Sequence, residues 1–180
     1  MATVIERYAG FAAGLALDQV EFEITLLGGD TTSTPGPISL SLTAIGHVEP
    51  GTAVHRFGAQ PGDGIWVTGT IGDGALGLQV ALGRLTDETG FLLSRYRLPQ
   101  PRVGLALGGI ASAAMDVSDG LIQDLGHICR ASGVRADVDA GKVPLSGPAR
   151  AAGPEWLETC LTGGDDYEVL MAVPPTHEAA

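Results

Sequence analysis

Hydrophobic residues recur along this chain with two different spacings. Residues 3–16 place apolar side chains three and four positions apart, which predicts an amphipathic helix. Residues 20–27 and 38–48 instead alternate or end in apolar runs, which predicts two β-strands. The start of the chain is therefore predicted to be one helix followed by two strands.

A break in this pattern follows. Residues 50–63 carry two Pro-Gly steps and show no periodicity, which is typical of a connection between domains. We therefore predict two domains, residues 1–57 and residues 58–180.

The second part alternates between predicted strands and helices. "AAMDV" predicts a strand that ends at Asp116, and a helix follows it, with Ser118 as N-cap and Gly133 as C-cap. Strands are also predicted within 65–70, 134–140 and 161–174, and helices within 72–85 and 99–113. The predicted apolar face of the central helix comprises Leu121, Ile122, Leu125, Ile128 and Cys129. This mixture predicts an α/β or α+β fold in two unequal pieces.

Composition narrows the classes of partner. The formal net charge is −11, which argues against nonspecific binding to nucleic acid or to an anionic membrane. The apolar run of residues 9–17 is too short to span a bilayer and lacks a basic lead-in. Cys129 and Cys160 form neither a metal cluster nor a disulfide framework. These features fit a protein of the reducing cytoplasm.

Three acidic turns are the candidates for chemistry. They are "GGDTT" (28–32), "DVSDG" (116–120) and "GGDDYE" (163–168). Glycine pairs let a backbone approach a ligand closely, and aspartates supply the oxygen ligands that Mg²⁺ prefers. In the second turn, Asp116 would end a strand and Asp119 would begin a helix, whose free amides could face a phosphate. An aspartate at a helix start also has a purely structural explanation, because it stabilises the helix dipole.

Familiar phosphate-binding and nucleophile motifs are missing from the sequence. No GxxxxGK[ST] loop is present, and the glycines of residues 69–77 do not follow the GxGxxG spacing. No serine lies in a GxSxG elbow, and the four histidines lack metal-ligand spacing. A bound phosphate would therefore need metal ions, backbone amides and an arginine, for which Arg56 is the candidate.

The order of the motifs resembles one family. "LLGGDTT", "HRFGAQPGDGIWVTGTIGDGALGL", "AMDVSDGLIQDLGHI" and "LTGGDDYEVL" look like thiamine-monophosphate kinases. Their superfamily includes aminoimidazole ribonucleotide synthetase and selenophosphate synthetase. The resemblance implies a two-domain aminoimidazole-ribonucleotide-synthetase-like fold, with residues 1–57 as the end of an ATP-binding and dimerisation domain and 58–180 as most of the C-terminal domain.

The resemblance also implies an activity and its ligands. Such enzymes transfer the γ-phosphoryl group of ATP to thiamine monophosphate with several Mg²⁺ ions, and they form cytoplasmic homodimers. By motif, Gly29, Asp30, Arg56 and Ser118 would bind ATP. Metal ligands would be Asp30, Asp116 and Asp119, and Asp165 would lie on the substrate side.

Departures from the family pattern qualify these roles. Asp165 stands where the family has glutamate, and the Thr31–Pro37 loop is longer than usual. The family's long N-terminal stretch, with further metal ligands, does not precede the first motif, so we expect an internal fragment with little or no kinase activity alone. The alternatives are a sister ATP-dependent enzyme with another substrate and a non-catalytic remnant that binds a nucleotide or a partner chain.

Overall fold

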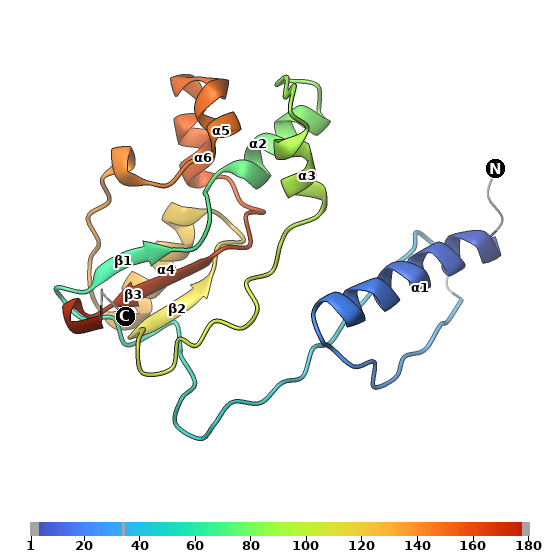
Figure 1. Ribbon diagram of the computed structural model, residues 1–180, viewed down its shortest axis with the longest axis horizontal. Coiled ribbons are helices and arrows are strands. Elements are labelled where there is room, and N and C mark those ends of the chain that lie inside the picture. The colour runs from blue at the N-terminus through green and yellow to red at the C-terminus, as the bar shows by residue number, and fades with distance from the viewer. Residues whose placement is uncertain (1–3, 34, 178–180) are drawn as a thin grey trace. The chain divides into compact units, whose positions relative to one another are not determined.

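The computed structural model describes residues 4–33 and 35–177 (Figure 1). The chain divides into two compact units, Met1–Gly46 and His47–Ala180, and each is described here by itself. Thr3, the first residue of the predicted opening helix, and Thr34, within the predicted long loop, lie outside the described residues.

The first unit is built on one long helix, α1, which spans Val4–Glu21. The predicted helix is therefore confirmed over its described part, and it continues further than its periodicity indicated. The chain turns back directly after it, because the Phe22 amide donates to the Asp18 carbonyl at 2.9 Å and the Leu26 amide donates to Oε1 of Gln19 at 3.2 Å.

The two strands predicted after this helix are wrong. The described residues of segments 20–27 and 38–48 form no strand, and their apolar side chains Ile24, Leu26 and Ile38 are exposed. A strand is stable only when it pairs with neighbours over a shared apolar face. The described residues supply neither segment with such a partner.

The second unit contains a three-stranded antiparallel sheet. The strands are β1 (Gly64–Val67), β2 (Ala113–Asp116) and β3 (Val169–Val173), in the order β1-β3-β2. Leu170 of β3 lies opposite Val67 on one side and Met115 on the other. All three strands overlap predicted segments, although β1 begins one residue earlier than predicted, at Gly64. Trp66 is 47% exposed, so β1 is an edge strand with one open face rather than the predicted buried strand.

The described residues of the second unit also form five α-helices. They are α2 (Asp73–Ala81), α3 (Phe91–Arg97), α4 (Leu121–Ser132), α5 (Gly147–Ala152) and α6 (Leu157–Thr162). Short 3₁₀ turns span Ala140–Lys142, Pro154–Trp156 and Pro175–His177. Figure 1 shows α4 against the sheet, whereas α2, α3, α5 and α6 gather beyond one end of it.

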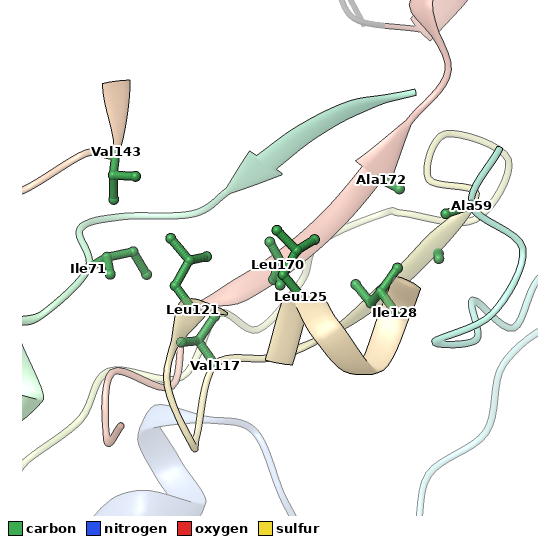
Figure 2. Close-up of a cluster of buried hydrophobic side chains, with 10 residues drawn as sticks. Ala59, Ile71, Val117, Leu121, Leu125, Ile128, Val143, Leu170 and Ala172 are labelled. Atoms are coloured by element: carbon green, nitrogen blue, oxygen red, sulfur yellow. The ribbon is translucent and has the colours of Figure 1, made fainter. Parts of the chain in front are cut away.

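The main core lies between α4 and the sheet. Leu121, Leu125 and Ile128 recur on one face of α4 and pack with the fully buried Leu170 of β3 (Figure 2). Ile122, which was predicted on the same face, is 43% exposed. A second, smaller core joins the helices beyond the sheet through Leu76, Leu92, Ala149 and Cys160.

Two further predicted elements are wrong. Residues 99–112 form turns rather than a helix, since Gly104 and Gly109 adopt φ values of 78° and 77° that end any helical run. Residues 134–139 form no strand; the Asp139 carboxylate accepts a hydrogen bond from the Gly141 amide and begins a 3₁₀ turn instead. Helices α3, α5 and α6 were not predicted.

The two compact units separate between Gly46 and His47, ahead of the predicted boundary between residues 57 and 58. Contacts explain this position: the Ala114 amide donates to the His55 carbonyl at 2.9 Å, and the Gly58 amide donates to Oγ of Ser132 at 3.1 Å. The segment before β1 is thus held by β2 and α4. No helix within residues 4–33 and 35–177 has both the length and the apolar composition that crossing a bilayer requires.

Candidate functional site

Two of the three acidic turns meet in the second unit. The Asp165 amide donates to the Ser118 carbonyl at 3.0 Å, and the Tyr167 amide donates to the Val117 carbonyl at 2.8 Å. The Val117 amide in turn donates to the Glu168 carbonyl at 2.8 Å. Residues 116–120 and 163–168 therefore form one hydrogen-bonded structure, which we call the acidic junction.

Glycines make this close approach of two backbones possible. A Cβ atom on Gly164 would collide with the Ser118 carbonyl oxygen, and one on Gly120 would collide with the Thr162 carbonyl oxygen at 2.5 Å. Gly120 also has a φ of 119°, which other residues rarely adopt. The glycines singled out in the sequence thus bring the turns together, in addition to any role beside a ligand.

The predicted site residues of the acidic junction lie at its surface. Asp116 and Asp119 are exposed, and Ser118 and Asp165 are half-buried. The Tyr167 hydroxyl donates to Oδ1 of Asp165 at 3.2 Å. Partial burial and then the negative charges of Asp165, Asp116 and Asp119 raise the pKa of Tyr167. The phenol therefore lies within the field of all three carboxylates.

Two residues of the acidic junction have left-handed backbones. Asp165 has a φ of 68° and Tyr167 a φ of 52°. A non-glycine residue in this region costs of order 1–3 kcal/mol, and such residues persist where the surrounding structure holds them. Here the bonds to Ser118 and Val117 hold them, and the alternation turns Asp165 and Tyr167 outward while Asp166 and Glu168 are fully buried.

The start of α4 differs from the prediction. The N-cap position is occupied by Gly120, not Ser118, and no side chain caps it from that position. Oδ2 of Asp124, one turn inside the helix, instead accepts hydrogen bonds from the amides of Ser118, Asp119 and Gly120 at 3.1, 3.0 and 3.1 Å. These amides were expected to face a phosphate, but in the structure they donate their hydrogen bonds to Asp124.

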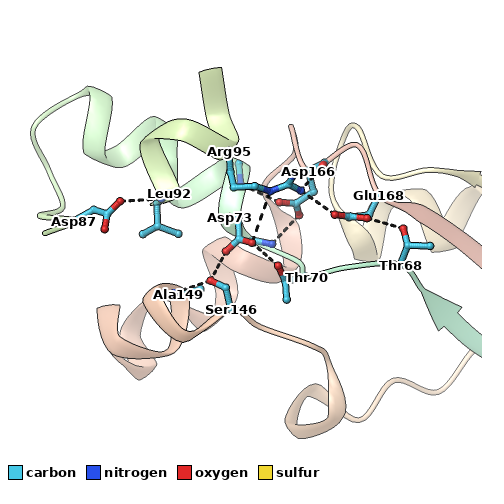
Figure 3. Close-up of polar contacts among 12 residues, drawn as sticks. Thr68, Thr70, Asp73, Asp87, Leu92, Arg95, Ser146, Ala149, Asp166 and Glu168 are labelled. Atoms are coloured by element: carbon cyan, nitrogen blue, oxygen red, sulfur yellow. Dashed lines mark hydrogen bonds and ion pairs between the residues drawn. The ribbon is translucent and has the colours of Figure 1, made fainter. Parts of the chain in front are cut away.

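The two buried acids of the acidic junction, Asp166 and Glu168, belong to a network of polar contacts (Figure 3). Glu168, which has no exposed surface, accepts from Arg95 Nη2 at 2.9 Å, from Arg102 Nε at 2.6 Å and from Thr68 Oγ1 at 2.6 Å. Arg95 also donates to the Asp166 carbonyl at 3.1 Å. Two arginines from the α3 region thus anchor the strand that leaves the turn. The sequence analysis assigned no role to Arg95, Arg102 or Glu168.

Asp166 connects the acidic junction to α2. Its two carboxylate oxygens accept from the amides of Gly72 at 2.7 Å and Gly74 at 2.9 Å, at the start of that helix. Burial raises the pKa of Asp166 to about 6, with Asp73 acting in the same direction and the two amides and Arg95 acting against it. The second aspartate of "GGDDYE" is therefore a helix cap and not a surface ligand.

The remaining predicted site residues lie outside the acidic junction. Gly29 and Asp30 are exposed in the first unit, where the Asp30 carboxylate accepts from the Thr31 amide at 2.7 Å. Arg56 is exposed beside His55, whose ring stacks on Phe57 with 4.8 Å between the centroids. The roles of these residues, like those of Asp116, Ser118, Asp119 and Asp165, stay predictions.

One group of side chains could hold a metal ion by distance alone. Asp119, Asp124 and His127 each offer one ligand atom, and these atoms lie within 4.8 Å of one another. Asp124 is already bonded to three amides, whereas Asp119 accepts a bond from Gln123 Nε2 at 3.2 Å. Within the described part of the chain, the exposed carboxylates of the acidic junction are better placed to meet a hydrated cation.

Comparisons with known proteins agree with the resemblance seen in the motifs. The chain is 49% identical over 173 residues to a thiamine-monophosphate kinase of Caulobacter vibrioides, covering 92% of this chain and 49% of the relative. The chain thus spans about half the length of the curated relatives that it matches.

Solved structures give the same result. A crystal structure of thiamine-monophosphate kinase from Stenotrophomonas maltophilia superposes with a TM-score of 0.67 at 41% identity, covering 73% of this chain and 45% of that chain. A structure of AaThiL complexed with AMPPCP and TMP superposes with a TM-score of 0.62 at 33% identity, covering 69% and 43%. The predicted resemblance and the predicted α/β fold of aminoimidazole-ribonucleotide-synthetase type are confirmed.

The family model described as AIR synthase related protein, C-terminal domain, matches residues 60–180. This range contains the sheet, its helices and the whole acidic junction. The chain therefore belongs to the AIR synthase related family and carries its C-terminal domain.

Proposed function

We propose that this chain is part of an ATP-dependent thiamine-monophosphate kinase. In that reaction a phosphate oxygen of thiamine monophosphate attacks the γ-phosphorus of ATP, the bond to the β–γ bridging oxygen breaks, and thiamine diphosphate and ADP result. One observation carries the proposal: the acidic junction gathers Asp116, Asp119, Asp165 and Tyr167 in a chain 49% identical to such a kinase. The AaThiL structure, complexed with AMPPCP and TMP, supports both ligands.

The residues of the acidic junction fit Mg²⁺. Asp116 and Asp119 present exposed carboxylate oxygens, the ligands that Mg²⁺ prefers. Neighbouring carboxylates repel one another, and a bound cation relieves that repulsion. We propose Asp116 and Asp119 as Mg²⁺ ligands, and we propose Asp30 of the first unit as a further Mg²⁺ ligand. The ion would neutralise phosphate charge and polarise the transferred group.

The chain's own residues would bind and orient the substrates. Because Asp124 occupies the amides of Ser118, Asp119 and Gly120, phosphates at this turn depend on metal and on cationic side chains. We propose Arg56, Gly29 and the Ser118 hydroxyl as further ATP contacts. Asp165, held outward by its left-handed backbone, would contact thiamine monophosphate, with its carboxylate oriented by the Tyr167 hydroxyl.

Charge, cysteines and exposed apolar side chains bear on the compartment and the partners of the enzyme. We propose a cytoplasmic homodimer that binds neither nucleic acid nor membrane. The net charge of −11 and two free cysteines support the compartment and the absence of polyanionic partners. Exposed apolar side chains on α1, including Phe11, Leu17 and Val20, support pairing through the first unit, which light scattering after gel filtration would test.

A chimera tests the proposed activity most sharply. This chain would replace the matching 173 residues of the Caulobacter relative. We expect the chimera to turn over ATP, Mg²⁺ and thiamine monophosphate at about 1 s⁻¹ or faster, as kinases do. The Asp116→Asn and Asp119→Asn variants of the chimera should lose this turnover.

Other outcomes identify the alternatives. A chimera that binds nucleotide with Mg²⁺ but never turns over would indicate a non-catalytic nucleotide-binding protein. Turnover with an aminoimidazole substrate in place of thiamine monophosphate would indicate a sister enzyme. For the chain alone we expect little or no turnover, and a rate near 1 s⁻¹ in the same assay would contradict that expectation.

A further inference from the structure

We infer that Asp124 is a positioning residue, which shapes the metal-binding face of the acidic junction without touching the ion. The inference rests on the proposed function, because it assigns Asp124 to the Mg²⁺ site of Asp116 and Asp119. Nothing in the sequence pattern separated this aspartate from an ordinary acidic residue in the first turn of a helix.

The geometry is unusual for a helix start. In a capping box, a side chain at the third helical position reaches back to one amide. Asp124 lies one position further on, and its Oδ2 accepts from three successive amides, those of residues 118, 119 and 120. Three donors converge on one oxygen only if the backbone curls around it. The carboxylate therefore defines the path of the turn that carries Asp119.

Burial fixes the position of this oxygen. Asp124 is 1% exposed and lies on α4 beside Leu121 and Leu125, which belong to the main core. Packing of α4 against the sheet is thus transmitted through Asp124 to the turn. The opposite end of the turn is fixed by β2, which ends at Asp116. The separation of the two exposed aspartates is set between these anchors.

The turn that Asp124 holds is also hydrogen-bonded to the second acidic turn, residues 163–168. The Ser118 carbonyl shares a peptide group with the Asp119 amide, which donates to Asp124, and this carbonyl accepts the Asp165 amide at 3.0 Å. Loss of the Asp124 carboxylate would free three buried or half-buried amides at once. Unpaired amides seek other partners, so the turn would lose its fixed shape.

A direct metal ligand is the competing role for Asp124. Asp119, Asp124 and His127 lie close enough to share an ion. The two roles differ in what His127 should do, because a positioning role leaves His127 without effect on metal affinity. They also differ in the effect of asparagine, which keeps an oxygen acceptor for the amides while it removes the charge.

The experiment measures metal binding and backbone shape in the same variants. Mn²⁺, as a paramagnetic probe for Mg²⁺, would be titrated into the chain and followed by electron paramagnetic resonance. Amide signals of Ser118, Asp119 and Gly120 would be followed in ¹⁵N–¹H spectra without metal. The variants are Asp124→Ala, Asp124→Asn, Asp119→Asn and His127→Gln. Asp137→Asn, at an exposed position after α4, is the charge-matched control.

We expect Asp124→Ala to weaken Mn²⁺ binding about 10- to 100-fold, as for other residues that orient metal ligands, and to shift the three amide signals. Asp124→Asn should keep much of the Mn²⁺ affinity and of the amide pattern of the unmodified chain. This variant also keeps the test informative if Asp124→Ala does not fold. Asp119→Asn should weaken Mn²⁺ binding, whereas the amide signals of Ser118 and Gly120 should stay in place. His127→Gln and Asp137→Asn should bind as the unmodified chain does.

Two results would overturn the inference alone. One is Mn²⁺ binding that Asp124→Ala leaves unchanged. The other is loss of binding in both Asp124→Asn and His127→Gln while the three amide signals stay in place, which would make Asp124 a ligand. An unmodified chain that binds no Mn²⁺, or binds it equally after Asp116→Asn and Asp119→Asn, would instead overturn the proposed metal site itself.

Discussion

Glu168 and Arg95 form an ion pair of 2.9 Å in which the carboxylate side chain has no exposed surface. Arg102 binds the same carboxylate from the segment after α3, so one buried acid joins two arginines that sequence analysis left unassigned. Glu168 directly follows the outward-facing Tyr167 in the chain, and Arg95 also bonds to the Asp166 carbonyl between Asp165 and Tyr167. The integrity of the pair therefore decides both the stability of the unit and the shape of the candidate site.

Removal of the Glu168 charge should destabilise the protein strongly. Glu168→Gln leaves two guanidiniums facing a neutral amide, and breaking a buried pair in this way costs about 3–5 kcal/mol. Urea unfolding followed by circular dichroism measures the change. Glu158→Gln, at an exposed position on α6, is the matched control and should change stability by less than about 0.5 kcal/mol. A loss below about 1 kcal/mol for Glu168→Gln would mean that the pair contributes little.

The stability of the chain should depend on pH through Asp166. Its pKa is raised from the ordinary 3.8 to about 6 by burial, so the folded state holds this proton more tightly than the unfolded state does. The contribution of Asp166 is therefore fully present below about pH 4 and is lost as pH rises to about 6. Urea unfolding of the unmodified chain and of Asp166→Asn, from pH 4 to pH 7, should show a dependence that the variant lacks. Parallel curves would contradict the prediction.

Sequence patterns correctly predicted those elements whose position depends on neighbouring residues in the chain. The α4 face, the strand ending at Asp116 and the left-handed C-cap at Gly133 followed from periodicity and residue preference. The strand predictions for the first 48 residues were wrong for a physical reason. Alternating apolar and polar residues indicate that a segment suits a sheet, but a strand also needs a neighbouring strand to pair with, which the pattern does not reveal.

The candidate site divides in the same way. The order of the motifs identified Asp116, Ser118, Asp119 and Asp165 as candidate site residues. In the structure all four lie in the acidic junction. The supporting residues escaped notice because their contacts span long sequence separations. Arg95 bonds to a residue 73 positions away, and Asp166 caps a helix that begins more than 90 positions earlier. No local pattern encodes such distances.

Nucleotide binding by this chain should require a divalent cation. The amides at the start of α4 are bonded to Asp124, so they are not free to hold phosphate. Titration of ATP by calorimetry should give binding heat with Mg²⁺ and none with excess chelator. The Asp116→Asn variant should resemble the chelated sample. Binding of equal strength without any divalent ion would contradict the proposed use of metal.

A methyl group at Gly164 should separate the two acidic turns. Its Cβ atom would collide with the Ser118 carbonyl oxygen, a backbone atom that cannot move without loss of the Asp165 hydrogen bond. We expect Gly164→Ala to lower the free energy of unfolding by about 1–3 kcal/mol. Gly147→Ala is the control, since a Cβ atom there meets nothing within 4 Å. Equal stability of the two variants would contradict the close packing of the turns.

The two thiols should differ in reactivity. Cys160 is 1% exposed, and burial together with the charges of Asp166 and Asp73 raises its pKa to about 11. Cys129 is only half-buried on α4. A thiol reagent such as Ellman's should therefore modify one equivalent quickly in the folded chain and the second only in urea, because the thiolate is the reacting form. Peptide mapping should assign the fast site to Cys129.

The order of the strands has a consequence for biosynthesis. β3 lies between β1 and β2, and the two outer strands make no pairing with each other within the described sheet. A ribosome must therefore release the chain as far as Val169, the first residue of β3, before the described strands can begin to pair. Both earlier strands wait unpaired during translation, so premature termination upstream of β3 leaves a product with no sheet at all, open to aggregation or degradation.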